Sequence, residues 1–497
     1  MRHPLAAASL IAISLIAASV LLAATAARAQ TIPPAAALWR ELATTDVEAA
    51  RGILLANHPA ALSEARDPAF AGTLALAYGA ALAHARQVTS FGGYAATLSA
   101  FAVAMGDHHI SSGMLLAPLR SQWPGFIVGK RGSAWMVVDE DPGPDGPLHG
   151  ARLISCDGRA PDDLARESLG VFRADWRVEA QQVQAAPWLL VDEGNPFVTR
   201  PKACVLEVGG QRRDVALAWR TVPRARLQPR LVKAMGSGEA GFGVRRAGGG
   251  YWISLQSLSA SAAPVVEAVR AQQAALRAAP FVVLDVRGNG GGASAYGRQI
   301  AEALMGEAHV RGLLGVETAD CGEAWRVSPA ALASLRADQE TIGRSAGAEE
   351  KALIDAMYAR TLAAQAAGRP FSSDLTCAAP HRLPPAPSLM KGRLVLLTDT
   401  ACFSSCLSLA DDFRRLGALH LGAPTDAATR YTEVVAMPLP SGLALFSTLQ
   451  ALDISSPPRL GPFEPSKRFD GDMADTPAVE AWVLATIPAT PAAAGAR

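Results

Sequence analysis

Two strand ends in this sequence carry residues that could perform acyl transfer. The apolar run 281–286 ends in Asp-Val-Arg and leads into a turn with glycines at 288, 290, 291 and 292. Glycine lets another group approach the backbone closely, so such a turn can present its N–H groups. A second apolar run, 393–400, leads into Ala-Cys-Phe-Ser-Ser-Cys at 401–406. Backbone amides from one strand end and a hydroxyl from the other indicate a hydrolase, although a glycine-rich surface turn is the simpler alternative.

The overall composition is that of a globular chain with several domains. It has 497 residues, of which 18% are charged and 50% hydrophobic, and its formal net charge is +1. No segment concentrates Lys and Arg into a basic stripe, which argues against nucleic acid as a partner. The length is sufficient for two or three domains.

Residues 1–29 have the pattern of a signal peptide. A basic Arg2 precedes an apolar stretch, and Ala27-Arg28-Ala29 before Gln30 fits the small-x-small cleavage rule. We therefore expect an exported protein, periplasmic or secreted, with no stable membrane span after cleavage. The alternative is an uncleaved anchor, because the stretch approaches spanning length.

Six cysteines in an exported chain favour disulfides. Sequence proximity within the candidate domains suggests the pairs 156–204, 321–377 and 402–406. The last pair would brace the serines between its cysteines, or it would stay reduced because the loop is short. No CxxC motif is present, so we expect no metal.

The chain after the predicted signal peptide divides into three regions by its sequence patterns. Residues 30–115 are alanine-rich with apolar residues at helical spacing, which predicts a helical N-terminal domain. Residues 116–223 contain short apolar runs between Pro and Gly turns, which predicts a β domain. From 224 to 497 strands alternate with helices, which predicts an α/β core. Helical patterns at about 318–388 interrupt this core and are interpreted as an insertion over the site.

Several motifs carry a resemblance to a known family. The turn 106–109 (Gly-Asp-His-His), the run 251–258, the segment 284–291 and the segment 401–406 occur in the family's order. Residues 106–113 and about 240–475 resemble the C-terminal-processing (tail-specific) serine peptidases and their tricorn-type relatives. The resemblance implies an α/β (α+β) multi-domain protein with a ClpP/crotonase-like catalytic core. The segment 151–158 and the helical pattern after it look like a PDZ-type module, or a generic β domain.

By this resemblance Ser404 is the nucleophile, and Ser405 is the rival. The structural alternative is that the serines only cap the following helix. The tail-specific peptidases use a lysine base about 25 residues after the serine, but residues 422–431 contain none, and arginine does not deprotonate in proteins. The tricorn-type relatives imply a histidine base instead. His109 fills that position, and His108 is the alternate.

The remaining site residues are also implied by the resemblance. A carboxylate about 60 residues after the serine would orient the histidine; Glu464 lies there, and Glu433 and Asp470 compete. The oxyanion hole would use the backbone amides of Gly290 or Gly291 and of Ser405. The Asp and Arg of the first strand end, at 285 and 287, would hold that end in place.

The sequence therefore predicts an exported serine peptidase that cleaves protein or peptide substrates through an acyl-enzyme on Ser404, with no metal or cofactor. Two alternatives share the fold. One is a noncatalytic protein that binds peptides or other ligands. The other is a crotonase-type acyl-CoA enzyme, against which export counts because that cofactor is cytoplasmic.

Overall fold

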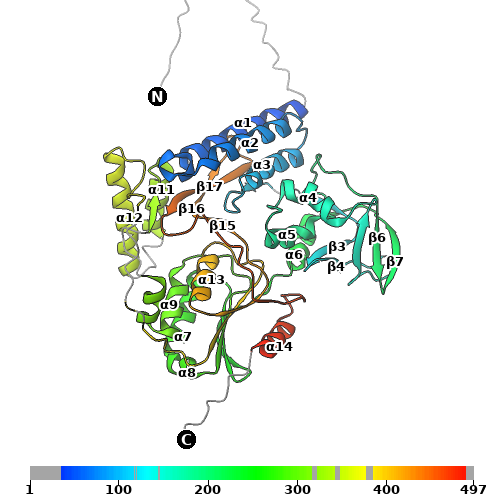
Figure 1. The fold of residues 1–497 in the computed structure, drawn as a ribbon. Coiled ribbons are helices and arrows are strands. Elements are labelled where there is room, and N and C mark those ends of the chain that lie inside the picture. The colour runs from blue at the N-terminus through cyan, green and yellow to red at the C-terminus, as the bar shows by residue number, and fades with distance from the viewer. Residues whose placement is uncertain are drawn as a thin grey trace, which may run out of the picture.

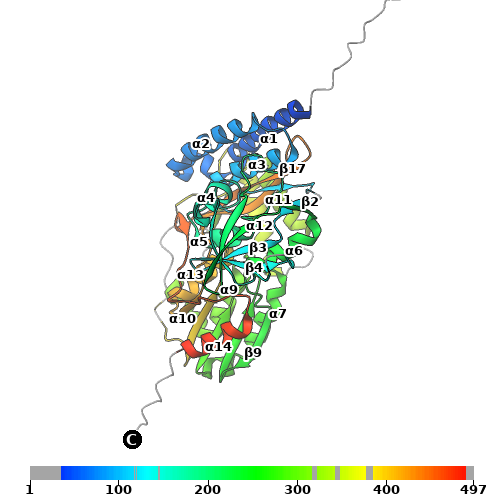
Figure 2. The ribbon, with the colours of Figure 1, turned by 90° about the vertical axis from the view of Figure 1, so that its right-hand side faces the viewer.

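A computed structural model describes residues 35–116, 118, 120–143, 146–315, 322–341, 348–376, 384 and 386–487. The predicted signal peptide and the predicted 321–377 cysteine pair lie outside these residues. In Figure 1, a layer of helices lies above an α/β core, and a β-rich lobe projects to one side. The turned view in Figure 2 shows that the helical layer and the core occupy opposite ends of an elongated molecule.

Three helices form the layer at one end of the molecule. The second begins where the Asp67 carboxylate accepts the N–H groups of Ala69 and Phe70. The third begins where the Ser90 hydroxyl accepts the N–H of Gly93. Each such cap contributes about 1 kcal/mol to helix stability. The helices are α1 (Ala35–Asn57), α2 (Pro68–Ala85) and α3 (Phe91–Ala104).

The layer packs on a four-stranded antiparallel sheet made mainly from the C-terminal part of the chain. The ring centroids of Phe101 in α3 and Phe446 lie 5.6 Å apart, and both side chains are buried in one shared core. Burial of these apolar side chains is the main force that joins the two ends of the chain. The strands are β1 (Ser112–Met114), β12 (Glu323–Trp325), β16 (Tyr431–Pro438) and β17 (Ala444–Asp453), and β17 pairs with the other three.

The lobe contains a five-stranded antiparallel sheet in sequential order. The predicted disulfide between Cys156 and Cys204 is formed and joins two adjacent strands. The strands are β3 (Phe126–Arg131), β4 (Ala134–Glu140), β5 (Arg152–Cys156), β6 (Ala203–Val208) and β7 (Gln211–Ala216). The helices and the small second sheet of this lobe are α4 (Pro161–Phe172), α5 (Glu179–Ala185), η3 (Ala186–Trp188), α6 (Arg224–Ala234), β2 (Arg120–Trp123) and β8 (Arg220–Pro223).

The core contains a six-stranded sheet whose strands are parallel except at one edge. Its order is β19-β14-β13-β11-β10-β9, and only β9 runs antiparallel to its neighbour. The carboxyl ends of parallel strands meet at one edge, so the two predicted site strands, β11 and β13, end side by side, with Asp285 paired to Leu397. The strands are β9 (Phe242–Ala247), β10 (Gly250–Leu255), β11 (Phe281–Asp285), β13 (Arg393–Thr398), β14 (Leu419–Gly422) and β19 (Lys467–Arg468).

Helices cover both faces of the core sheet. One face packs against α7, α9 and α13, and the other against α14, which lies alone at the edge of the core in Figure 1. The helices are α7 (Ala263–Ala271), α8 (Gln273–Ala278), α9 (Ala295–Met305), α10 (Glu307–Leu314), α13 (Ser405–Arg415) and α14 (Thr476–Thr486). The other named elements after β10 are η4 (Ala260–Ala262), α11 (Pro329–Thr341), α12 (Ala348–Ala366), β15 (Ala428–Thr429) and β18 (Arg459–Leu460).

The prediction of a mixed α/β multi-domain protein is confirmed, whereas the ClpP/crotonase-like and PDZ-like descriptions stay predictions.

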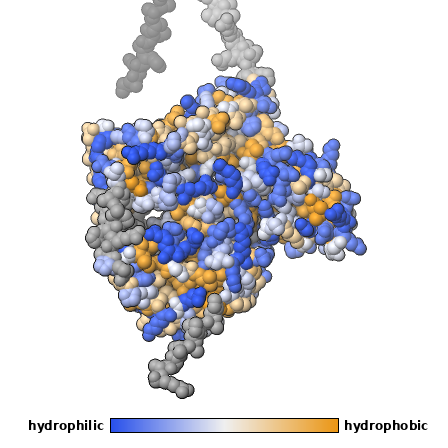
Figure 3. Space-filling view, viewed as in Figure 1, coloured by the Kyte–Doolittle hydropathy of each residue, from blue (hydrophilic) through white to orange (hydrophobic). Residues whose placement is uncertain are grey.

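Hydrophilic and hydrophobic residues are interspersed over the face seen in Figure 3. No helix of the described residues is long and apolar enough to cross a membrane.

Candidate active site

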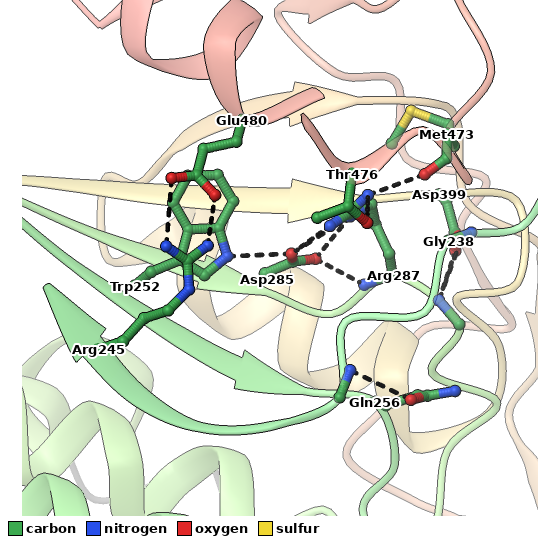
Figure 4. A network of polar contacts seen from close by, with 12 residues as sticks. Gly238, Arg245, Trp252, Gln256, Asp285, Arg287, Asp399, Met473, Thr476 and Glu480 are labelled. Carbon is green, nitrogen blue, oxygen red and sulfur yellow. Dashed lines mark hydrogen bonds and ion pairs between the residues drawn. The ribbon is translucent and has the colours of Figure 1, made fainter. Parts of the chain in front are cut away.

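The first strand end is fixed by a buried ion pair. The Arg287 Nη2 lies 2.8 Å from the Asp285 Oδ2, and both side chains are 1% exposed. The indole N–H of Trp252 also donates to this carboxylate, and Arg287 donates to the Met473 carbonyl. Figure 4 shows these partners converging from the sheet and from the segment before α14. The pair therefore ties the end of β11 to the neighbouring strand β10 through Trp252 and to the segment before α14 through Met473, and holds it in place.

A buried carboxylate links the two strand ends. Asp399, just after β13, accepts N–H groups from Gly238, Gly288 and Ala401 at 2.7 to 3.1 Å. Burial raises the pKa of Asp399 to about 6, although these hydrogen bonds favour the charged form. The Asp399 carboxylate therefore ties the glycine turn to the serine segment.

The glycine turn packs directly against the serine segment. The Asn289 side chain donates to the Leu255 carbonyl and accepts the N–H of Gly291, and the Asn289 carbonyl accepts the N–H of Phe403. Gly291 has a φ of 105°, and a Cβ on it would lie 2.7 Å from the Cβ of Ser404. Only glycine fits there without moving the serine.

Ser404 has an unusual backbone conformation at the junction between strand and helix. Its φ is 57° and its ψ is −131°, and α13 begins at the next residue. A non-glycine residue with positive φ is uncommon and strained, and such residues occur frequently at active sites. The Ser404 side chain makes no capping hydrogen bond to the helix. The Ser405 hydroxyl instead donates to the Gly292 carbonyl.

Backbone N–H groups next to Ser404 are available to a ligand. The Gly291 N–H is already bound to the Asn289 side chain. For the N–H groups of Gly290 and Ser405 we find no acceptor in the described part of the chain. A Cβ at position 290 would meet nothing within 4 Å, so this turn faces open space. Of the three predicted oxyanion donors, Gly290 and Ser405 are therefore the free ones.

His109 is held by a buried aspartate. Its Nδ1 lies 2.9 Å from the Asp107 Oδ1, which also accepts the His109 backbone N–H. The other Asp107 oxygen accepts the backbone N–H and the hydroxyl of Thr429. Burial opposes the charged form of Asp107, but the His109 and Thr429 hydrogen bonds outweigh it and hold the pKa of Asp107 well below its usual range. The His109 ring packs on Phe403, the neighbour of Ser404, with centroids 4.3 Å apart.

His108 has a separate carboxylate partner. Its Nδ1 lies 2.7 Å from the Oδ2 of Asp426, whose side chain is fully buried, and its ring centroid is 5.0 Å from that of Phe403. Burial lowers the pKa of His108, but the hydrogen bond and the charge of Asp426 outweigh this effect, so the net shift is upward. Two histidines, each with its own aspartate, therefore flank the serine segment.

The acids expected from the sequence lie elsewhere. The Glu464 side chain is 58% exposed and pairs with Arg468 at 2.6 Å. No hydrogen bond joins Glu464 to either histidine within the described ranges. Glu433 lies on β16, and Asp470 follows β19. The roles of these acids stay predictions.

Sequence reasoning did not assign Asp107 and Asp426 as histidine partners. Asp107 could have been found from its position two residues before His109 in a turn, because an Asp side chain often accepts the N–H two residues later. Asp426 is 318 residues from His108, and no local signal connects them.

A disulfide brackets the candidate nucleophile. Cys402 and Cys406 are bonded, as predicted, and both are fully buried in the core. Ser404 is the central residue of the loop that this bond closes. Among the residues described, no group of His, Cys, Asp and Glu side chains could hold a metal ion.

The fold and this site define an α/β protein in which a serine and free backbone amides meet at the carboxyl ends of parallel strands. No family model matches the chain, and no curated protein matches it. Mature CPAF is similar in structure, with a TM-score of 0.57 and 15% identity over 90% of this chain and 97% of that one. Mature CPAF complexed with lactacystin has a TM-score of 0.54 and 14% identity over 87% and 94%. The photosystem II D1 C-terminal processing protease matches with a TM-score of 0.28 and 14% identity over 87% and 93%.

At this level of identity, the likeness to CPAF shows a shared fold that extends over nearly the whole of both chains.

Proposed function

We propose that this protein is an exported serine peptidase that hydrolyses protein or peptide substrates through an acyl-enzyme on Ser404. One observation carries the proposal: the strained backbone of Ser404, at φ 57°, between a parallel strand and a helix. A sharp strand-to-helix turn of this kind exposes a nucleophilic hydroxyl at the edge of a sheet. The resemblance of the motifs to the tail-specific peptidases supports the same reaction.

His109 is the proposed general base. In the neutral tautomer that donates its Nδ1–H to Asp107, His109 would offer its Nε2 as the acceptor for the Ser404 proton. Asp107 fixes this tautomer and stabilises the imidazolium that forms. We propose Asp107 as the third group, with Glu464 as the alternative that the resemblance implies. The arrangement is a Ser-His variant, as in the tricorn-type relatives, rather than Ser-Lys.

The carbonyl oxygen of the scissile bond would be stabilised by two backbone amides. The N–H groups of Gly290 and Ser405 are the proposed donors, since the Gly291 N–H is bound to Asn289. The N-terminal end of α13 adds a favourable field for the negative charge. His109 then gives its proton to the leaving amine, and water attacks the Ser404 ester with His109 again as the base.

Export is supported by the signal-peptide pattern and by two disulfides. Disulfides persist in oxidising compartments, which fits a periplasmic or secreted protein. As part of the same proposal, the α/β core has a ClpP/crotonase-like fold.

Hydrolysis of an unfolded protein tests this function. The protein purified after export would be incubated with reduced, carboxymethylated casein, and the products identified by mass spectrometry. We expect cleavage that Ser404→Ala abolishes and that Ser405→Ala largely retains. Binding of casein without any cleavage by the folded wild type would overturn the proposal in favour of the noncatalytic binding protein.

A further inference from the structure

Helix α5 of the β lobe contacts the candidate active site through two glutamines. The Gln181 Nε2 donates to the Asp426 Oδ1 at 2.8 Å, and both side chains are buried. The Gln184 Nε2 donates to the carbonyl of Thr400, in the segment that leads to Ser404. Residues three apart in a helix lie on the same face, so α5 presents one polar face to both segments.

Asp426 belongs to a loop that connects the two halves of the site. Its backbone N–H donates to the Cys402 carbonyl at 3.0 Å, on the nucleophile side. Its carboxylate binds His108, and Thr429, in β15 just after this loop, binds Asp107. A shift of this loop would therefore move the serine and the histidines relative to one another.

Other contacts hold α5 against the same region. Glu179 forms an ion pair with Arg468 at 2.9 Å, and Val178 and Ala180 pack on Ala427. Gln182, the next residue of the helix, instead bonds to Lys130 and to the Trp176 carbonyl within the lobe. Gln181 therefore bridges the two parts, because its Oε1 accepts the Asp175 N–H of the lobe at 2.8 Å while its Nε2 donates to Asp426. Both polar contacts of Gln182 lie within the lobe.

We propose that Gln181 is a positioning residue through which the docked β lobe sets the reactivity of Ser404. The inference rests on the proposed function. Asp426 is a fully buried carboxylate, and its bonds to His108, Gln181 and the Ala427 N–H replace the water that it lost on folding. Removing one donor leaves a buried acceptor unsatisfied, so the loop must move or admit water. Displacement of catalytic groups by about 1 Å can lower a rate about 100-fold.

The first test compares two matched substitutions in one helix turn. The second-order rate constant for labelling of Ser404 by a fluorophosphonate is measured for Gln181→Leu and Gln182→Leu. This small reagent does not depend on peptide binding. We expect a fall of about 10- to 100-fold for Gln181→Leu and little change for Gln182→Leu. Equal rates in both variants and the wild type would overturn the inference.

Gln181→Glu separates positioning from a general structural effect. An ionised Glu at 181 would repel Asp426, whereas a protonated one can donate a hydrogen bond as Gln181 does. We expect the labelling rate of this variant, divided by that of the wild type, to rise steadily from pH 8 to pH 5.5. A ratio independent of pH would count against the inference.

A third measurement does not require activity. The titration midpoint of His108 is followed by NMR, because this ring shares Asp426 with Gln181. With one donor gone, the Asp426 charge acts more strongly on the imidazolium, so we expect the midpoint to rise by about half a pH unit in Gln181→Leu and to stay unchanged in Gln182→Leu. If the wild type is never labelled, the proposed function is refuted. The His108 titration would still test the role of Gln181, because an unchanged midpoint in Gln181→Leu would overturn the inference.

Discussion

Gly291 and Ser404 approach so closely that position 291 has no room for a side chain. A Cβ there would lie 2.7 Å from the Ser404 Cβ, and the φ of 105° is itself unfavourable for any other residue. The glycine turn therefore supports the serine directly.

Gly291→Ala should disable Ser404, because the serine or the turn must move. We expect fluorophosphonate labelling to fall at least about 100-fold and the melting temperature to drop. Gly290→Ala is the matched control for stability, since a Cβ there meets nothing within 4 Å. Its melting temperature should stay close to that of the wild type. If both variants melt like the wild type, the close packing described for Gly291 is wrong.

The Cys402–Cys406 disulfide should stabilise the backbone around Ser404. Its loop is short, so the chain-entropy model gives only about 2 kcal/mol of folding stability. Both sulfurs belong to residues that are fully buried, and the loop is the one that carries the nucleophile. We expect the double substitution Cys402→Ala with Cys406→Ala to lower the labelling rate of Ser404 by a larger factor than it lowers the affinity for casein. Removal of the 156–204 disulfide by the same double substitution is the control, and it should leave the labelling rate of the folded protein unchanged.

The ion pair between Arg287 and Asp285 should matter far more to stability than a surface pair. Arg287→Leu leaves a buried carboxylate without its cation, which costs about 3–5 kcal/mol. In the pair of Arg245 and Glu480, drawn beside it in Figure 4, the side chains are 46% and 28% exposed. Arg245→Leu should cost about 1 kcal/mol or less. Urea unfolding of both variants measures these costs, and similar values for the two would contradict this account of the strand end.

Because of Asp399, the free energy of unfolding should fall as the pH rises from about 4 to about 6. The pKa of Asp399 in the folded protein, about 6, lies above the ordinary value of 3.8, so the folded state binds this proton more tightly. The stabilisation is complete below the ordinary pKa and is lost as the pH rises through about 6, with a total on the order of 3 kcal/mol.

Asp399→Asn should remove this dependence, although the variant is less stable at every pH because an amide has only one acceptor oxygen. The measurement is the difference in unfolding free energy between wild type and variant from pH 4 to pH 7. A difference that stays constant over this range would show that Asp399 does not titrate there.

The two strand ends could be predicted from the sequence because the patterns that mark them are local. The apolar runs at 281–286 and 393–400 correspond to β11 and β13, and the parallel pairing of these strands brings the glycine turn beside Ser404. The disulfide at 402–406 followed from proximity in the same way.

Contacts between distant segments were beyond such reasoning. The partner of His108 depends on how the loop 423–427 folds over Cys402. The pairing of β1 with β17 joins residues more than 300 positions apart. Glu464 was predicted to orient His109 from a spacing that the family resemblance implies. The turn at Asp107 places a different carboxylate beside the His109 ring.

The most direct test of the account is to locate a fluorophosphonate adduct on the folded protein by peptide mass. We expect a single adduct on Ser404, absent in Ser404→Ala, retained in Ser405→Ala, and formed far more slowly in His109→Ala than in His108→Ala. An adduct on Ser405, or a rate that His109→Ala leaves unchanged, would contradict the assignment of Ser404 and His109 as nucleophile and base.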